Sequence, residues 1–425
     1  MRILLVSDHY PPFIGGAHRQ TQLLGHELHA RGHSVSVATV WHGGLPAEAD
    51  DDGVKVYRLK QLRTALPGLV RDHKQRHQPP YPDPVTIWQL RRVLRHEQPD
   101  VVHAYGWMAY SAAVALAGLP IPLLVSARDY GYSCASRTLL YRDHACSGPA
   151  PLKCLDCTTH YYGLPKGWAA TLGVYLSAPL LRRRVTGLHS ISTYVQEMMR
   201  RDFLDDTARP AGRPLPHVII PSFQEGAAVG SSNGTAVEAD LQPFVDQLPA
   251  QPFILFVGAL RLVKGLKPLL SAYTQLKSPP PLVLIGTVEH DTPHDLPPGV
   301  VVLQNFPHRA VMAAWDRCLF GVLPSLWAEP LGSVVYEGMS RGKAVIGSTP
   351  GGHTDMIVPE ETGLLVPAGD VESLRAAIQR LLDDPALRQS FGTAGLARSR
   401  RFTAEVAVPQ FEQAYQLVGA PGRQP

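Results

Sequence analysis

Residues 1–38 read MRILLVSDHYPPFIGGAHRQTQLLGHELHARGHSVSVA, and this segment predicts the fold class. Ile3–Ser7 is an apolar run of strand length, and Ala17–Arg31 has the apolar periodicity of a helix. Gly32 ends the helix, and Val35–Ala38 resumes an apolar strand. Two strands joined by a helix in so short a segment form a βαβ unit, which implies parallel strands covered by helices. We therefore expect an α/β protein with a parallel sheet.

The same order of strands and helices begins again in the second half of the chain. Phe253–Gly258 is an apolar strand that ends in glycine. The patterns that follow are Leu266–Leu276, Leu282–Ile285, Val300–Leu303, Leu319–Leu323 and Ala344–Gly347. Residues 222–252 are rich in Gly, Ser, Ala, Pro and Gln and lack periodicity, which is typical of a linker region. We predict two doubly wound domains, residues 1–221 and 222–401, with ligands at the carboxyl ends of their strands.

The composition excludes several classes of protein. The chain has 425 residues, of which 45% are hydrophobic and 18% charged, so neither a disordered nor a fibrous protein is expected. The sequence has no run of about 18 apolar residues, which argues against a membrane-spanning helix. The apolar run at residues 3–6 is too short for a secretory signal and is followed by Asp8, which predicts a cytoplasmic protein.

Charge is distributed unevenly along the chain. Residues 1–215 contain 25 Lys and Arg against 17 Asp and Glu, whereas residues 216–425 contain 15 against 19. A basic first half favours an anionic partner or surface, and compositional drift is the alternative. The segments Arg58–His96 and Leu180–Arg184 combine leucines with basic residues. Both can be interpreted as solvated surface or as peripheral contact with the inner face of an anionic membrane.

The segment Glu329–Glu337, EPLGSVVYE, follows a predicted strand and indicates a phosphate site. Gly332 permits close backbone approach, Ser333 is a good helix cap, and the helix start offers N–H groups to a diphosphate. Two carboxylates that flank such a site are suited to hold hydroxyl pairs of a sugar and a ribose. A capped amphipathic helix with incidental glutamates is the alternative. The residues expected at the substrate here are Pro324, Leu331, Gly332, Ser333, Val334 and Glu337.

The loop Gly258–Gly265 follows the first strand of the second half. Arg261 offers a planar fork and Lys264 a point charge, a pairing suited to diphosphate oxygens. Two solvated loop cations are the alternative. The loop is not a Walker A sequence, and neither strand–helix turn contains G-x-G-x-x-G.

Together these motifs resemble the family-4 retaining glycosyltransferases. The resemblance is carried by the E-x7-E pair Glu329 and Glu337, Arg261 with Lys264, Gly15-Gly16, Pro350-Gly351-Gly352 with Asp355, and Thr362–Pro367. It covers nearly the whole chain and is stronger in the second half. It implies the GT-B fold, in which two Rossmann-like domains face each other across a cleft. It also implies that a C-terminal helix, here within residues 402–425, returns to the first domain.

The resemblance implies roles for individual residues. Glu337 would hold the ribose and Glu329 the donor-sugar hydroxyls. Arg261 and Lys264 would bind the diphosphate, which the Gly15-Gly16 loop of the first domain would approach. The family needs no divalent metal for catalysis, and no side chain has to act as an obligatory general base.

Two segments of the first half resemble acceptor-side motifs of that family. His103 follows an apolar run and is similar to the family's cleft histidine, so we predict it to be catalytic together with Arg261, Lys264 and Glu329. A structural histidine is the alternative. Arg128-Asp129-Tyr130 resembles a His-Asp-aromatic segment in which arginine replaces the histidine. We expect Asp129 to bind substrate.

Four of the five cysteines lie within 24 residues, inside an apparent insertion at residues 130–165. They are Cys134, Cys146, Cys154 and Cys157, of which the last two form a C-x2-C pair. The spacing predicts a structural zinc site, because disulfides are rare in the cytoplasm. Two disulfides or reduced core thiols are the alternatives. Asp50-Asp51-Asp52 formally contains a D-x-D metal motif, but it precedes Gly53 and is more typical of an exposed turn.

The sequence therefore predicts a hexosyltransferase that retains anomeric configuration. Its donor would be a nucleotide-diphosphate sugar and its acceptor a glycan or lipid-linked hydroxyl, in synthesis of a cell-surface polysaccharide, a glycolipid or a related glycan. A nucleotide-sugar 2-epimerase and a phosphorylase are alternatives of the same fold. A non-catalytic nucleotide-sugar-binding protein is an alternative of another class. We expect no nucleic-acid partner.

Overall fold

A computed structural model describes residues 1–12, 16–65, 78–142, 144–204, 215–224 and 240–419. The chain forms two compact units. The first unit is Met1–Phe223 with Ala407–Pro425, and the second unit is Gln224–Val406. The first division therefore follows residue 223, where the sequence predicted a boundary after residue 221. The second division falls inside the C-terminal helix α15 (Ala404–Gly419), so this helix begins in the second unit and ends in the first.

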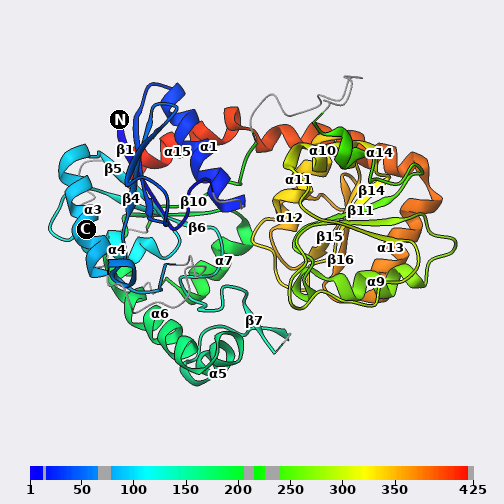
Figure 1. Ribbon diagram of the computed structural model, residues 1–425, viewed down its shortest axis with the longest axis horizontal. Coiled ribbons are helices and arrows are strands. Elements are labelled where there is room, and N and C mark those ends of the chain that lie inside the picture. Colours follow the sequence, from blue (N-terminus) through cyan, green and yellow to red (C-terminus); the bar gives the residue numbers. More distant parts are fainter. Residues whose placement is uncertain (13–15, 66–77, 143, 205–214, 225–239, 420–425) are drawn as a thin grey trace. The chain divides into compact units, whose positions relative to one another are not determined.

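The first unit is built on an eight-stranded sheet in the order β10-β9-β6-β5-β1-β2-β4-β3 (Figure 1). The strands are β1 (Arg2–Ser7), β2 (Ser34–Val40), β3 (Glu48–Asp51), β4 (Val54–Leu59), β5 (Val101–Tyr105), β6 (Leu123–Ala127), β9 (Gly187–Ser190) and β10 (His217–Ile219). Neighbouring strands pair in parallel, except β3 and β4 at the edge. Helix α1 (Gly16–Ala30) connects β1 to β2, which confirms the βαβ unit predicted from residues 1–38.

Besides α1 and the end of α15, the described part of the first unit contains six α-helices. They are α2 (Leu62–Ala65), α3 (Pro84–Glu97), α4 (Met108–Ala115), α5 (Pro151–Tyr162), α6 (Leu164–Arg184) and α7 (Thr193–Asp202). Helix α3 illustrates the local rules. The Asp83 side chain accepts a hydrogen bond from the Thr86 N–H at 2.9 Å, Pro84 occupies the first turn, and Gln98 ends the helix in the left-handed conformation.

The three consecutive aspartates lie at the edge hairpin. Asp52 and Gly53 have φ angles of 52° and 87°, and the Gly53 N–H donates to the Asp50 side chain at 2.9 Å. The Asp51 carboxylate accepts hydrogen bonds from Tyr10 and Gln22 and pairs with a histidine of α1. This geometry is a hairpin turn, as the sequence indicated.

The second unit has a six-stranded, fully parallel sheet in the order β13-β12-β11-β14-β15-β16. The strands are β11 (Ile254–Val257), β12 (Leu282–Ile285), β13 (Val300–Leu303), β14 (Phe320–Leu323), β15 (Val345–Thr349) and β16 (Gly363–Pro367). The helices are α8 (Gln242–Val245), η3 (Leu262–Lys264), α9 (Leu266–Thr274), α10 (His308–Arg317), α11 (Ser333–Ser340), α12 (His353–Met356), α13 (Val371–Asp383), α14 (Pro385–Ser399) and η4 (Arg400–Phe402).

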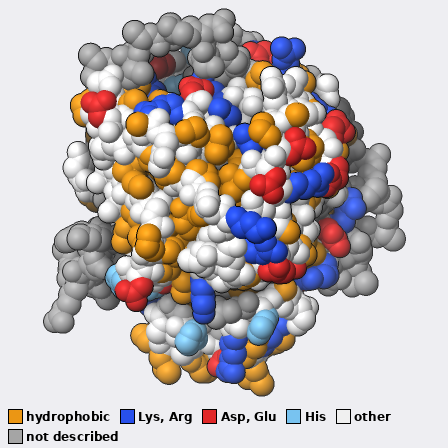
Figure 2. Space-filling view, turned by 90° about the vertical axis from the view of Figure 1, so that its right-hand side faces the viewer, with side chains coloured by type: hydrophobic (Ala, Val, Ile, Leu, Met, Phe, Trp, Pro, Cys, Tyr) orange, Lys and Arg blue, Asp and Glu red, His pale blue; other side chains and the backbone are white. Residues whose placement is uncertain are grey.

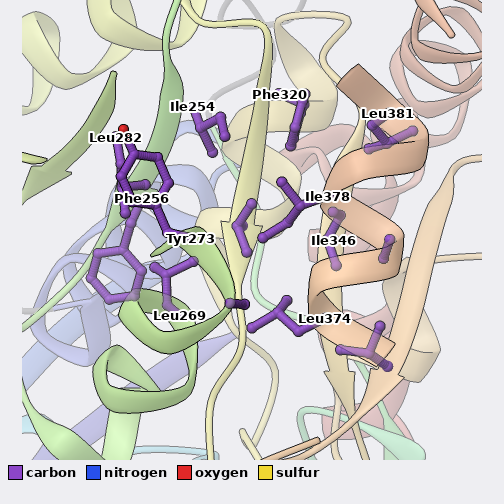
Figure 3. Packing of buried hydrophobic residues seen from close by; sticks show 14 of the residues in the cluster. Ile254, Phe256, Leu269, Tyr273, Leu282, Phe320, Ile346, Leu374, Ile378 and Leu381 are labelled. Carbon is purple, nitrogen blue, oxygen red and sulfur yellow. The ribbon is translucent and has the colours of Figure 1, made fainter. Parts of the chain in front are cut away.

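The core of the second unit lies between its sheet and two of its helices. Figure 3 shows Ile254, Phe320 and Ile346 from the sheet among side chains of α9 and α13. All three of these sheet residues are fully buried. The short apolar runs read from the sequence are therefore central strands, buried as expected for a parallel sheet covered by helices. Among the described helices, none has the length and apolarity to cross a bilayer.

Candidate functional site

The candidate donor site lies at one edge of the second unit's sheet. Strands β11, β14 and β15 are neighbours, and their parallel pairing brings their carboxyl ends to the same edge. The loops that follow them are residues 258–265, 324–332 and 350–352. The sheet order thus gathers motifs that lie far apart in the sequence.

Glu329 is the centre of this site. Its Oε1 accepts hydrogen bonds from Lys264 Nζ at 2.5 Å, Ser325 Oγ at 2.7 Å and Trp327 Nε1 at 2.7 Å. Among the described residues, Oε2 has no hydrogen-bond partner, although the residue as a whole is only 7% exposed. Burial would raise the pKa of Glu329, but the nearby Lys264 ammonium and the hydrogen bonds lower it below its usual value. The carboxylate is therefore charged, with one oxygen anchored and one available.

Glycines allow the three loops to approach one another. A Cβ at Gly265, where φ is 81°, would overlap the carbonyl oxygen of Pro324. A Cβ at Gly351 would lie 2.8 Å from the Glu329 nitrogen, and the Gly352 N–H donates to the Glu329 carbonyl at 2.6 Å. Larger residues at these positions would push the loops apart. The glycines therefore hold the backbone around Glu329 in place.

The start of α11 differs from the prediction. Gly332, with φ 78°, is the N-cap residue and Ser333 is the first helical residue, so the expected cap by Ser333 is wrong. Within the part of the chain that the structure describes, no side chain caps this helix start. A Cβ at Gly332 would overlap Nε2 of His353, a buried residue whose Nδ1 accepts from the Ser348 N–H at 3.1 Å. His353 fills the space beside Gly332 and thereby favours glycine there.

The other predicted donor residues contact separate partners. Arg261 Nε donates to Asp291 at 3.3 Å, so Arg261 and Lys264 contact different carboxylates. Glu337, on α11, pairs with His308 Nε2 at 3.2 Å. A diphosphate that used Arg261 would compete with the Asp291 carboxylate. His308, Asp291 and His353 were not predicted, although His353 directly follows the Gly351-Gly352 pair.

The remaining predicted substrate residues differ in burial. Pro324 and Leu331 are buried, so only their backbone groups can face a ligand. Ser333 and Val334 are half-buried at the helix start. In the first unit, Gly16 is the first residue of α1, and Gly15 lies outside the described residues.

A cavity of about 60 Å³ that is open to solvent lies at the carboxyl ends of β1, β5 and β6 in the first unit. Its lining includes Asp8, Tyr105, Trp107, Arg128, Asp129 and Arg137. Of these, the sequence predicted only Asp129 as a substrate-binding residue. Asp8 follows directly after β1, at the edge where α/β proteins bind ligands, and this position could have identified it.

The polar groups of the cavity are held by their neighbours. Asp8 caps α4 by accepting from the Trp107 and Met108 N–H groups at 2.9 and 2.7 Å. Burial raises the pKa of Asp8 to about 6, against the opposing effect of Arg137. Asp129 accepts from Arg137 Nη2 at 2.6 Å, and that guanidinium lies 4.9 Å from the centre of the Trp107 ring. The cavity therefore presents an aromatic wall and fixed charged groups.

The structure does not support His103 as a group that touches substrate. His103 is fully buried in the middle of β5. Its Nδ1 is bonded to the hydroxyls of Tyr415 and Tyr105 at 2.8 and 2.9 Å, and its Nε2 to Ser126 Oγ at 2.6 Å. Burial, with the neighbouring His189, lowers the pKa of His103, so the ring is neutral. It acts as a structural residue that ties α15 to the sheet. Tyr105, which is also buried, ends the strand and lines the cavity.

The four clustered cysteines are free thiols of intermediate exposure. Burial raises the pKa of Cys157, and its proximity to the other three cysteines raises this pKa further. Cys154 Sγ accepts a hydrogen bond from the Ala150 N–H at 3.4 Å. Within the described residues, the three side chains whose potential metal-ligating atoms all lie within 4.8 Å of one another are His26, Asp51 and Asp52. No three of the described cysteine sulfur atoms lie that close together. The cysteines are thus a chemically suitable set for zinc whose sulfur atoms would have to draw closer to bind it.

Comparison with known proteins identifies the class. Residues 15–210 match the family described as Glycosyl transferase 4-like domain, and residues 241–398 match Glycosyl transferases group 1. Glycogen synthase of Mycobacterium tuberculosis is 24% identical over 418 residues, which cover 92% of this chain and 88% of that protein.

Solved structures support the same fold. Sucrose-phosphate synthase from Thermosynechococcus elongatus has a TM-score of 0.73 at 19% identity, covering 99% of this chain and 100% of the other. Anabaena Alr3699/HepE in complex with UDP has a TM-score of 0.65 at 16% identity, and the match covers 97% of this chain and 99% of the other. The chain is therefore a glycosyltransferase of the GT-B fold. More particularly, it combines a 4-like domain in its first unit with a group 1 domain in its second.

Proposed function

We propose that the protein transfers a sugar from a nucleotide-diphosphate donor to an acceptor hydroxyl and retains the anomeric configuration. The observation that best supports this proposal is the arrangement of Glu329. Three donors hold Oε1, and Oε2 remains available at the carboxyl edge of the sheet. A charged, immobilised carboxylate oxygen is suited to accept hydrogen bonds from sugar hydroxyls.

The groups around Glu329 suit the departing diphosphate. Lys264 would bring positive charge to it, and the uncapped start of α11 would offer N–H groups. Arg261 would exchange its contact with Asp291 for a phosphate oxygen. Glu337, half-buried on α11, would accept from the ribose hydroxyls.

Retention follows if attack and departure occur on one face of the sugar. The bond between the anomeric carbon and the phosphate oxygen breaks while a bond to the acceptor oxygen forms. The acceptor proton passes to the departing phosphate oxygen, so no side chain has to remove it. The protein then supplies orientation and electrostatic stabilisation.

The cavity of the first unit would receive the acceptor. Trp107 offers an apolar wall for a sugar ring, and Asp8 and Asp129 offer hydrogen-bond acceptors. We assign to it a glycan or lipid-linked hydroxyl, in synthesis of a cell-surface polysaccharide, a glycolipid or a related glycan. A structural zinc held by Cys134, Cys146, Cys154 and Cys157 is part of the same proposal.

A thermal-shift screen against nucleoside diphosphates and their sugar conjugates tests the proposal, because a ligand that binds the native state raises the unfolding temperature. We expect one nucleoside diphosphate and one of its conjugates to stabilise the wild type. Glu337→Gln should reduce both shifts, whereas Glu329→Gln should reduce chiefly the additional shift due to the sugar. Stabilisation by no nucleotide would contradict the donor-site assignment. Binding followed by conversion to an epimer, or by no turnover, would indicate an epimerase or a binding protein.

A further inference from the structure

Helix α6 presents a row of large apolar side chains to solvent. Seven of the sixteen exposed large hydrophobic residues in the described part of the chain belong to α5 and α6. Five of them follow one another at four-residue spacing along α6, so they are neighbours on its surface. They are Leu164 (66% exposed), Trp168 (48%), Leu172 (50%), Leu176 (71%) and Leu180 (44%). Such a continuous stripe is unusual on a surface that stays in water.

The buried face of α6 consists largely of small residues, although Val174 and Leu181 are also buried there. An ordinary surface helix instead turns most of its large apolar side chains toward the core. Its buried positions include Gly167, Ala170, Gly173, Ser177 and Ala178. A Cβ at Gly167 would lie 2.6 Å from the backbone of Thr159 in α5, so the two helices pack in close contact. The leucines and the tryptophan are therefore not required for folding of this hairpin, and their outward position calls for an external partner.

The charges at the edges of this face specify an anionic partner. α6 contains no acidic residue, and its exposed charged residues are Lys166 near the start and Arg183 near the end. Asp156, on α5, is paired with Arg142 and Tyr141. A second copy packed antiparallel on the same face would set Lys166 against Arg183. Charge complementarity thus disfavours self-association and favours a negatively charged apolar surface.

The arginines at the end of α6, Arg182–Arg184, contribute mostly to contacts within the protein, whereas the sequence suggested solvated surface or membrane contact. The Arg184 side chain is buried and donates to the carbonyls of Leu119 and Ile121 at 3.0 and 2.6 Å. The Arg182 guanidinium lies 5.3 Å from the centre of the Phe203 ring. Of this run, Arg183 is the exposed cation. The contact surface is therefore the stripe from Leu164 to Leu180 rather than the arginine run itself.

We propose that the exposed face of α6 lies in the surface of an anionic lipid bilayer. The leucines and Trp168 would enter the boundary between headgroups and acyl chains, and Lys166 and Arg183 would contact anionic headgroups. The helix cannot span a bilayer, so it would lie in the membrane plane. Figure 2 shows, at its lower end, hydrophobic side chains beside Lys, Arg and His side chains, with few acidic ones. This inference does not depend on the proposed sugar transfer.

Vesicle flotation tests the inference with the full chain. The probes are phosphatidylcholine vesicles with and without phosphatidylglycerol. The wild type should float with the anionic vesicles, and binding should fall at high salt, which shortens electrostatic range. Leu172→Ser with Leu176→Ser should weaken binding about a hundredfold, since each buried leucine contributes roughly tenfold or more. Lys166→Glu with Arg183→Glu should abolish the preference for anionic lipid.

A matched pair of tryptophans provides the control. Trp168→Ser should weaken binding, whereas Trp88→Ser should not. Trp88 lies on α3, in the other basic segment, and its side chain is 60% exposed. All these positions are exposed, and unchanged circular dichroism and unfolding temperatures would verify that the variants fold. Equal flotation with neutral and anionic vesicles, or wild-type binding by Leu172→Ser with Leu176→Ser, would overturn the inference. Light scattering that shows a dimeric wild type and a monomeric Leu172→Ser with Leu176→Ser variant would also overturn the inference, because it would identify a second copy as the partner of this face.

Discussion

Replacement of Lys264 by methionine tests the ion pair at the centre of the donor site. Methionine keeps an apolar stem and removes the ammonium group, so Glu329 keeps its bonds from Ser325 and Trp327 but loses its counter-charge. Loss of one partner of a buried pair costs roughly 3–5 kcal/mol. Because the Lys264 side chain is 29% exposed and two hydrogen bonds remain, we expect a cost of about 2–3 kcal/mol in the free energy of unfolding at neutral pH.

The pH dependence distinguishes a lost charge pair from lost packing. Burial raises the pKa of Glu329, but Lys264, His353 and hydrogen bonds lower it further, to below its usual value. In the wild type this stabilisation is present above the unfolded-state pKa of about 4.3 and is lost as pH falls through the folded-state pKa. Without Lys264, burial dominates and the pKa rises. The variant should therefore gain stability on acidification, and its deficit relative to the wild type should shrink.

The assay is urea unfolding followed by tryptophan fluorescence, at neutral pH and near pH 4. Lys267→Met, at an exposed residue three positions further along the chain, is the matched control and should cost little. The double variant Lys264→Met with Glu329→Gln should recover part of the loss, because no unpaired carboxylate remains. An equal cost for the two lysine variants, or a Lys264→Met deficit that stays constant with pH, would refute the reasoning.

Three further predictions concern other groups. Glu337→Gln should weaken nucleoside-diphosphate binding by about 1.5–3 kcal/mol in calorimetry, and an unchanged affinity would remove Glu337 from the site. Elemental analysis of the purified protein should find about one zinc per chain, and the Cys154→Ser variant should contain none. A reduced wild-type protein that contains no metal and has four titratable thiols in the cluster would exclude the site. The pKa of Asp8 is raised to about 6, so wild-type stability relative to Asp8→Asn should fall by about 2–4 kcal/mol as pH rises from 4 to 7. A constant difference in urea unfolding would contradict that pKa.

The fold was largely predictable because its signals are local. Ile3–Ser7 and Phe253–Gly258 are apolar runs of strand length, and each is followed along the chain by a helical pattern. Parallel sheets place such strands side by side with their carboxyl ends at one edge. This rule also explains why the Lys264 loop and Glu329, 65 residues apart, meet in the structure.

The details of the sites depended on contacts between residues that are far apart along the chain, which cannot be read from local sequence patterns. His103 was predicted at a strand end, but β5 continues to Tyr105 and α15 covers the histidine. Ser333 was predicted as a helix cap, but His353, from a different loop, favours glycine at the preceding position. Each error arose from a neighbour distant in sequence.

The face of α6 could not be assigned from periodicity alone. A leucine at every fourth position predicts a helix but does not say which side faces the protein. Here small residues such as Gly167 pack inward, and the row from Leu164 to Leu180 points outward. The decisive information is the close approach of α5, which only the structure provides.

Proton NMR of the sugar released from the donor tests the central claim most directly. Water can act as a slow acceptor, so the stabilising nucleotide sugar should be hydrolysed by the wild type and more slowly by Glu329→Gln. From an α-linked donor, the account predicts that the first sugar signal is that of the α-anomer, with the β-anomer appearing later by mutarotation. If the β-anomer appears first, transfer inverts the configuration and the proposed mechanism is wrong.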